Sequence, residues 1–214
     1  MSPKLIDLTQ IIEPTDVGAE RKFVVNIHNA LHEVEGKVRP EGEWYIMSDV
    51  ELMNHVGTHI ETPFHCLKDG ADLSQIALDQ LCGEAVILDL RQAEAEFGVT
   101  LAQVQAAATA AGGILPETSS SGRWAKRATS PPKGCAGSWS RDQAHGRRFR
   151  RCGTVARHHP RQRQPPAPLR AGIPLIENLA NLDQLSQSRV QVYALPIPVR
   201  GLDAFPLRVV AVEG

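Results

Sequence analysis

The sequence predicts an α/β fold, and three features support this prediction. Short apolar runs, bounded by polar residues, proline or glycine, recur along the chain and are typical of strands. Other stretches begin at helix-capping residues. A length of 214 residues suits a single domain, residues 1–214, with a substantial core.

Apolar runs predict the strands in order along the chain. The run that follows Gly83 has the composition of a buried strand, and two runs in the last third are expected to close the sheet. The predicted strands span residues 4–8, 22–27, 45–52, 85–90, 190–195 and 207–212.

Capping residues predict two helices in the first half of the chain. Asp72 or Ser74 is expected to cap a helix that runs to about residue 82. Thr100 is expected to cap a helix at 101–111, which two consecutive glycines end. A third, short helix is predicted around residues 179–185, after the run 172–177.

Residues 116–170 do not follow this pattern. They hold 13 of the 23 Lys and Arg but only two of the 24 acidic residues, and Val155 and Leu169 are the only Leu, Ile or Val in the segment. A segment with so little apolar area cannot form a core. We therefore expect this basic, Pro- and Arg-rich segment to be poorly ordered.

The rest of the composition indicates in which compartment of the cell the protein is found. No apolar run reaches the roughly 20 residues that a membrane span needs, and the first residues lack an apolar signal region. The four cysteines show no CxxC spacing, which suits reduced thiols. We expect a cytoplasmic protein with no membrane partner.

The most informative stretch is residues 54–65, which contains four ligand-type side chains. His55, His59, Glu61 and His65 share one parity, so in an extended chain they would face the same side. Gly57 has the same parity, and its missing side chain is expected to leave space for an ion. Imidazole and carboxylate ligands suit zinc, manganese, iron, cobalt or nickel. Histidines that merely pack in a strand are the alternative interpretation.

Other histidines carry weaker signals. His28 and His32 have helical spacing, but a surface position is the better explanation for them. His158 and His159 lie in the unusual basic segment, and we assign them no role. Trp44 and Tyr45 precede the ligand-rich stretch and could line a pocket or pack in the core. The sequence does not identify substrate-binding residues.

The stretch resembles the motif HxGTHxDxPxH of the cyclase-type metal-dependent hydrolases, which include bacterial kynurenine formamidase and isatin hydrolase. The chain differs from the motif at Glu61, which replaces the usual aspartate and adds one methylene. The resemblance continues through 68–72 and 83–86 and returns at 172–179 and 196–208.

The resemblance implies a swivelling β/β/α domain with a central mixed sheet and flanking helices. It implies that His55, His59 and Glu61 bind a metal, that Glu177 is a bridging or second-metal ligand, and that His65 moves protons. The cofactor would be one or two divalent transition metals, zinc or manganese, activating a water as nucleophile. The substrate would be a small-molecule amide, either an arylformamide such as N-formylkynurenine, as in tryptophan catabolism, or a cyclic amide. A homodimer or homotetramer is expected.

The basic segment departs from the family. Pro165 stands where the family has a histidine 12 residues before Glu177, and proline cannot bind a metal. A shifted reading frame in the encoding DNA would explain the excess of Arg and Pro and the abrupt return of family-like sequence, and a genuine insertion is the alternative.

Two other functions compete with amide hydrolysis. A catalytically impaired homologue with an incomplete metal site would follow from the missing histidine. Nucleic-acid binding through the basic segment is the second alternative, since its cations could neutralise phosphates. The chain shows no nucleic-acid-binding motif, so we expect no nucleic-acid partner.

Overall fold

The computed structural model describes residues 2–14, 22–29, 46–90, 100–113, 124–128, 137–140 and 167–214. Most of the segment 116–170 lies outside these ranges, so its expected lack of order stays a prediction. Within that segment the structure places two strands and one short helix, α2 (Ala167–Arg170).

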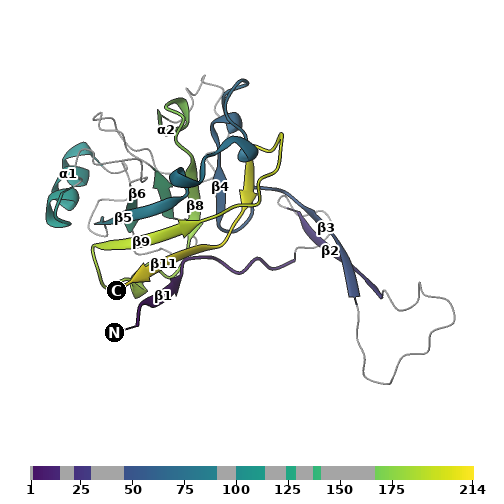
Figure 1. Ribbon diagram of the computed structural model, residues 1–214, viewed down its shortest axis with the longest axis horizontal. Helices are drawn as coiled ribbons and strands as arrows, with labels where there is room; N and C mark the ends of the chain where they lie inside the picture. The colour runs from purple at the N-terminus through teal and green to yellow at the C-terminus, as the bar shows by residue number, and fades with distance from the viewer. Residues whose placement is uncertain are drawn as a thin grey trace.

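Most described strands belong to one mixed sheet (Figure 1). They are β1 (Lys4–Asp7), β4 (His59–Glu61), β5 (Cys82–Asp89), β6 (Trp124–Ala128), β7 (Gly137–Ser140), β8 (Leu175–Leu179), β9 (Arg189–Ala194), β10 (Ala204–Pro206) and β11 (Val209–Glu213). Their order across the sheet is β1-β11-β9-β5-β6-β7-β8-β4-β10. The pair β5–β6 is parallel and the other pairs are antiparallel.

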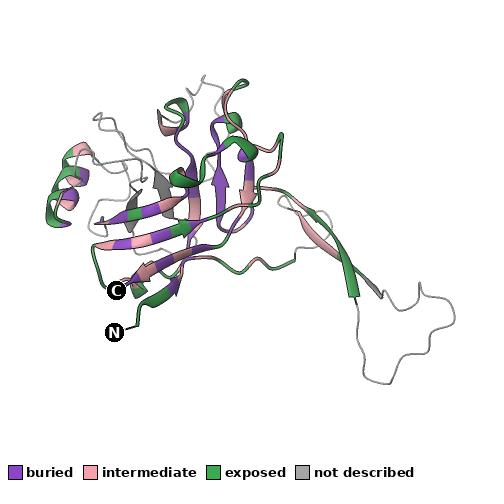
Figure 2. Cartoon of the chain, viewed as in Figure 1, coloured by how far each residue is buried: buried purple, intermediate pink, exposed green. Residues whose placement is uncertain are grey.

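Strand β5 is buried on both faces, which confirms the strand predicted at 85–90. Ala85 points into the main core, beside the alternating apolar residues of β9 and β11. Val86 and Leu88 point the other way, where they pack against α1 (Leu101–Ala110). Because side chains alternate along a strand, those of β5 are divided between two apolar clusters. Figure 2 shows the buried residues in β5 and α1.

Helix α1 forms as its sequence predicts. The Thr100 side chain accepts a hydrogen bond from the backbone N–H of Gln103, whose side chain accepts from the backbone N–H of Thr100 in return. This capping box satisfies two donors at the helix start. After the helix, Gly112 and Gly113 have φ values of 84° and 85°, a conformation that glycine adopts without strain.

Two predicted helices are wrong. The stretch from Asp72 to residue 82 forms two single 3-10 turns, Leu73–Gln75 and Leu78–Gln80. Asp72 does cap the first turn, but Ile76 then takes an extended conformation and turns its side chain into the main core. The predicted helix at 179–185 is the end of β8 followed by one 3-10 turn, Leu182–Gln184.

Strands β2 (Phe23–Asn29) and β3 (Ile46–Leu52) form a separate antiparallel pair that projects from the body as an arm (Figure 1). Both match predicted strands. Among the described residues, no helix is long and apolar enough to cross a membrane.

Candidate metal centre

The centre is organised on β4, between β8 and β10. His59 and Glu61 alternate along β4 and therefore project from the same face, as predicted. The register pairs His59 with Glu177 of β8, and opposed residues of an antiparallel pair share a face. His59 Nε2 consequently lies 3.8 Å from both Glu61 Oε1 and Glu177 Oε2.

His55 and His65 reach the same point by another route. His55 lies in bends before β4, and His65 ends a 3-10 turn, Pro63–His65, after it. The expected extended chain from 55 to 65, strand or loop, is therefore limited to β4, because bends precede this strand and a 3-10 turn follows it. The chain nevertheless brings the three rings together. The centroid of the His55 ring lies 5.1 Å from that of His59 and 4.6 Å from that of His65.

Gly57 has a different role from the one predicted. Its φ is +60°, and a Cβ there would lie 2.6 Å from Cγ1 of Ile12. The glycine thus permits a left-handed turn and the close approach of the N-terminal segment. It does not clear space for an ion.

Buried polar side chains fix the loop that carries the ligands. Thr58 is fully buried; its hydroxyl donates to the Asn178 carbonyl (2.6 Å) and accepts from the Gln10 backbone N–H (2.9 Å). The Gly57 carbonyl accepts from both His59 Nδ1 (2.9 Å) and Asn178 Nδ2 (3.0 Å). Sequence reasoning assigned no role to Asn178.

These contacts decide which nitrogen of His59 faces the centre. A carbonyl oxygen only accepts, so His59 Nδ1 must carry the proton. The Nε2 lone pair then faces the two carboxylates, which is the arrangement of a metal-binding imidazole. His59 is 1% exposed, so water does not compete freely for this lone pair.

Glu61 is held in its charged form. Burial would raise its pKa, but the hydrogen bond with His55 and the charges of the neighbouring imidazoles outweigh burial and lower the pKa of Glu61 to about 2. The same bond to Glu61 raises the pKa of His55, against the effect of its burial.

Asp203 is a member of the centre that sequence reasoning missed. Its Oδ2 accepts from His55 Nε2 (3.1 Å) and His65 Nδ1 (2.7 Å), and its Oδ1 accepts from Asn54 Nδ2 (2.6 Å). Burial raises the pKa of Asp203, but these three bonds prevail and lower it to about 2. Asp203 falls in the family-like run 196–208, yet no local pattern distinguishes it from other surface acids.

The donor set fits a divalent transition metal. Ligand atoms about 2.1 Å from a tetrahedral ion lie about 3.4 Å from each other. The distance from His55 Nδ1 to Glu61 Oε1 is 3.2 Å, and the two His59–carboxylate distances are both 3.8 Å. Ligand atoms of His55, His59 and Glu61 all lie within 4.8 Å of one another.

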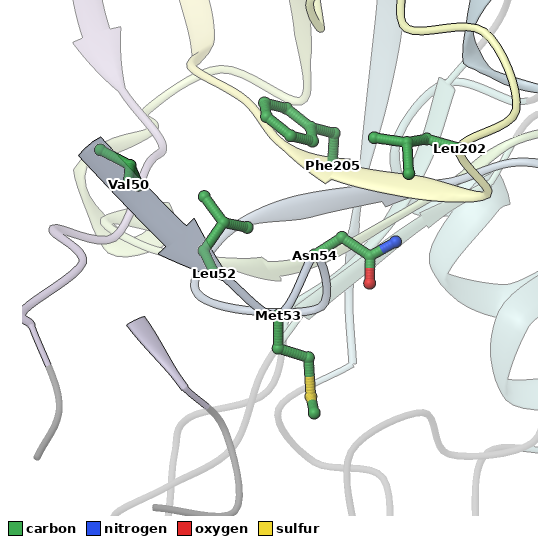
Figure 3. A pocket seen from close by; sticks show the side chains of 6 residues that line it. All are labelled: Val50, Leu52, Met53, Asn54, Leu202 and Phe205. Carbon is green, nitrogen blue, oxygen red and sulfur yellow. The ribbon is translucent and has the colours of Figure 1, made fainter. Parts of the chain in front are cut away.

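An apolar pocket of about 550 Å³ lies where the arm joins the body (Figure 3). Its lining includes Asn54, the hydrogen-bond partner of Asp203, so the pocket adjoins the polar centre. The lining residues are Val50, Leu52, Met53, Asn54, Leu202 and Phe205.

The remaining candidates lie elsewhere. His28 belongs to β2 in the arm, whereas His32, His158, His159 and Pro165 lie outside the described residues, as do Trp44 and Tyr45.

Comparisons with solved structures agree with this architecture. Isatin hydrolase A from Labrenzia aggregata, bound to benzyl benzoate, is 19% identical, with a TM-score of 0.63 over 98% of this chain and 93% of that one. Isatin hydrolase A from Ralstonia solanacearum is 19% identical, with a TM-score of 0.65 over 99% and 92%. A predicted metal-dependent hydrolase from Bacillus stearothermophilus is 20% identical, with a TM-score of 0.61 over 100% of both chains.

A search of curated proteins finds no match. The family model Cyclase, described as "Putative cyclase", matches residues 6–128, more than half of the chain and the whole ligand-bearing stretch. The match ends inside the basic segment, after β6. By this match and its cyclase-like fold, the chain belongs to the cyclase family.

Proposed function

We propose that this protein is a metal-dependent hydrolase that cleaves a C–N amide bond. One observation carries the proposal: His55, His59 and Glu61 converge with ligand atoms within 4.8 Å of one another, as around a single ion. Glu177 adds a second carboxylate 3.8 Å from His59 Nε2. The fold neighbours named isatin hydrolase and metal-dependent hydrolase support the same chemistry.

The chain's own residues divide the work. His55, His59 and Glu61 would hold the ion, and Glu177 would complete or bridge the site. A divalent metal bound there polarises a carbonyl and lowers the pKa of water. The His65 side chain is 36% exposed at the edge of the centre, and its Nε2 lies 3.8 Å from Glu61 Oε1. In that position His65 would accept a proton and return it to the leaving nitrogen of the amide.

The apolar pocket beside the centre suits a substrate with an aromatic ring. An arylformamide such as N-formylkynurenine, or a cyclic amide, would place its ring there and its carbonyl near Glu61 and His65. Zinc or manganese would serve as the metal, in one or two ions. Hydrolysis of N-formylkynurenine would place the enzyme in tryptophan catabolism.

The proposal also covers the fold class, the cellular location and the assembly of the enzyme. We assign the fold to the swivelling β/β/α class, supported by the mixed sheet with α1 against β5. A cytoplasmic homo-oligomer without membrane or nucleic-acid partners is the assembly we propose.

Metal content and hydrolysis test the function together. We would measure bound metal in wild type, His59→Ala and Glu84→Gln, and turnover of N-formylkynurenine and isatin by absorbance. Glu84 is the matched control, because it is an exposed acid on β5 that pairs with Arg189 away from the centre. We expect metal and turnover in wild type and the control, and loss of both in His59→Ala.

Two results would contradict the proposal. Negligible metal in all three proteins would exclude the metal centre. Bound metal without turnover of either substrate would favour the impaired homologue, the alternative that the missing histidine suggests.

A further inference from the structure

We propose that Asp72 is a positioning residue that sets one wall of the apolar pocket, the wall formed by Leu202. The inference rests on the proposed function for its substrate, because the ring of an aromatic amide would lie against that wall. The Asp72 carboxylate bonds to Ser74 and Gly201, so it would act through the backbone that carries Leu202.

Two short segments of the chain line the pocket. One runs from the end of β3 into the loop before the motif, at residues 50–54, and the other lies at residues 202–205 (Figure 3). Their separation sets the width of the pocket and therefore which apolar group can contact both sides. Phe205 belongs to β10, where it pairs with Ile60 of β4, whereas Leu202 precedes that strand. Leu202 therefore depends on contacts outside the sheet for its position.

Two hydrogen bonds from one neighbouring turn provide these contacts. Asp72 Oδ2 accepts from the backbone N–H of Gly201 at 2.8 Å, and the backbone N–H of Leu73 donates to the Leu202 carbonyl at 3.1 Å. Gly201 has a φ of 78°, a left-handed conformation that glycine adopts without strain. The two bonds bracket residues 201 and 202 and thus fix the backbone of Leu202 from both sides.

Asp72 is itself firmly anchored. Its Oδ1 accepts from the backbone N–H of Ser74 (2.9 Å) and from the Ser74 hydroxyl (2.7 Å), and its own backbone N–H donates to Gln75 Oε1 (2.9 Å). The next residue, Leu73, is 2% exposed and packs in the main core. A carboxylate held by this cap and by a buried neighbour can impose a fixed position on Gly201.

Asp203, the next residue after Leu202, is held independently of this contact. Its carbonyl accepts from the backbone N–H of Thr62 (2.8 Å) and from the Thr62 hydroxyl (2.9 Å), and its Oδ1 accepts from Asn54 Nδ2 (2.6 Å). Loss of the bond between Asp72 and Gly201 should therefore move Leu202 and leave Asp203 in place. The expected effect is on binding of the ring and not on the metal centre.

The substitution Asp72→Asn removes this contact selectively. Ser74 provides two donors to Oδ1 and Gly201 provides one to Oδ2, so the amide oxygen should stay with Ser74. The NH₂ then faces the Gly201 N–H, and two donors cannot form a hydrogen bond. Asp79→Asn is the matched control, because it makes the same change at an exposed position of the next 3-10 turn, Leu78–Gln80.

The test compares acetohydroxamate and benzohydroxamate on Zn²⁺-loaded protein, since both carry the same metal-binding group and only the second carries a phenyl ring. Calorimetry gives the two Kd values, and their ratio measures the contribution of the ring. In wild type we expect benzohydroxamate to bind at least about 10-fold more tightly. Asp72→Asn should reduce this advantage about 4-fold or more, the equivalent of one buried CH₂, without changing the Kd of acetohydroxamate. Asp79→Asn should keep the wild-type ratio.

A double-mutant cycle shows whether Asp72 acts through Leu202. Leu202→Ala should lower the advantage of the ring by itself, and adding Asp72→Asn should then change it no further. A general loss of stability would weaken both hydroxamates alike and would act equally in both backgrounds. An equal effect of Asp72→Asn with and without the Leu202 side chain would overturn the proposal, and so would an unchanged ratio in Asp72→Asn.

The outcomes separate this proposal from the proposed function. If the ratio falls as expected but wild type hydrolyses no amide, the role of Asp72 stands and the proposed function fails. A wild type that binds both hydroxamates equally would refute the role of Asp72.

If wild type binds neither hydroxamate, the proposed metal centre fails, and the order parameter of the Leu202 methyl groups in metal-free protein decides the role of Asp72. NMR relaxation of ¹³C-methyl-labelled leucine should give a lower value in Asp72→Asn than in wild type, and equal values would refute the proposal. Should Asp72→Asn not fold, Asp72→Ser takes its place, because serine keeps a cap but is too short to reach Gly201.

Discussion

Glu61 occupies the middle of the centre, because its Oε1 lies within 3.8 Å of the imidazoles of His55, His59 and His65. The centre is therefore a carboxylate surrounded by histidines, with a second carboxylate, Glu177, on the far side of His59.

His65 is expected to serve the reaction rather than the metal. We predict that His65→Ala lowers kcat about 10²–10⁴-fold and leaves metal content close to wild type. The reason is its position, since it is the most exposed of the three rings and its Nδ1 is committed to Asp203. Parallel metal analysis and steady-state kinetics measure both quantities. A loss of metal equal to the loss of turnover would make His65 a ligand instead.

The low pKa values of Glu61 and Asp203 predict how the metal-free protein responds to acid. Both pKa values are about 2, below the ordinary 4.5 and 3.8, so their charged forms stabilise the fold above those ordinary values. That stabilisation is lost as pH falls from the ordinary values toward about 2. His55 acts in the opposite sense, because its raised pKa gives stability that is full below 6.5 and disappears as pH rises through the raised value.

Thermal melts of metal-free protein across this acidic range test the expectation. Glu61→Gln should flatten the loss of Tm on acidification, because the glutamine has no proton to gain. Glu84→Gln, at an exposed position of β5, should melt with the wild-type acid dependence. Equal acid dependence in all three proteins would mean that Glu61 titrates alike in the folded and unfolded chain.

At the scale of single residues, the sequence indicated the side chains that cluster at the centre but not the residues that support them. His55, His59, Glu61 and His65 were visible because they are close in the chain and chemically unusual together. Asp203 was not, since its partnership with His65 spans 138 residues and depends on the β4–β10 register. Glu177 was located by family resemblance alone, and its place beside His59 comes from the β4–β8 register.

Among the elements, the turn before β4 depends on Gly57. We predict that Gly57→Ala destabilises the protein by roughly 2–5 kcal/mol, from left-handed strain and overpacking against Ile12. Gly113→Ala is the matched control, because its φ is +85° but nothing lies within 4 Å of a Cβ there. It should cost only about 1–3 kcal/mol.

Urea unfolding of both variants, alone and with Ile12→Ala, separates the two effects. In the Ile12→Ala background the cost of Gly57→Ala should drop to that of Gly113→Ala, because the atom at 2.6 Å is gone. An unchanged cost would show that backbone strain accounts for the whole effect.

The accuracy of the element predictions followed the length of the apolar pattern. Strands β5, β9 and β11 and helix α1 have enough alternating or capped residues to be recognised. Strands β4 and β10 have three residues each, too few to show a period. The stretch after Asp72 has a genuine helix cap, but burial of Leu73 and Ile76 in the main core overrides the helix that the cap predicts.

On the scale of the whole molecule, the β2–β3 arm exposes an apolar face to solvent. The β2–β3 register places Phe23, Val25, Ile27, Val50 and Leu52 on one face. Ile27 and Val50 remain 60% and 53% exposed. A two-stranded sheet alone is only marginally stable, and an exposed apolar face commonly marks an interface.

We therefore predict a homo-oligomer that buries the apolar face of the arm. Light scattering after gel filtration should give a dimer or larger for wild type and a smaller species for the double variant Ile27→Ser, Val50→Ser. Val24→Ser is the control, because Val24 lies on the opposite face of the same strand. A monomeric wild type would contradict the prediction.

The wide separation of the centre's parts in sequence has a consequence for how the protein is made. His55 binds Asp203 across 148 residues, and the strand that carries Glu177 is made long after β4. A nascent chain on the ribosome therefore displays its histidine motif well before the partners that shape it exist. On the proposed function, the imidazoles of the motif would be able to meet metals during that interval, before β4 is enclosed between β8 and β10. Selection of the metal would then be a late event of biosynthesis, made by the finished sheet rather than by the motif.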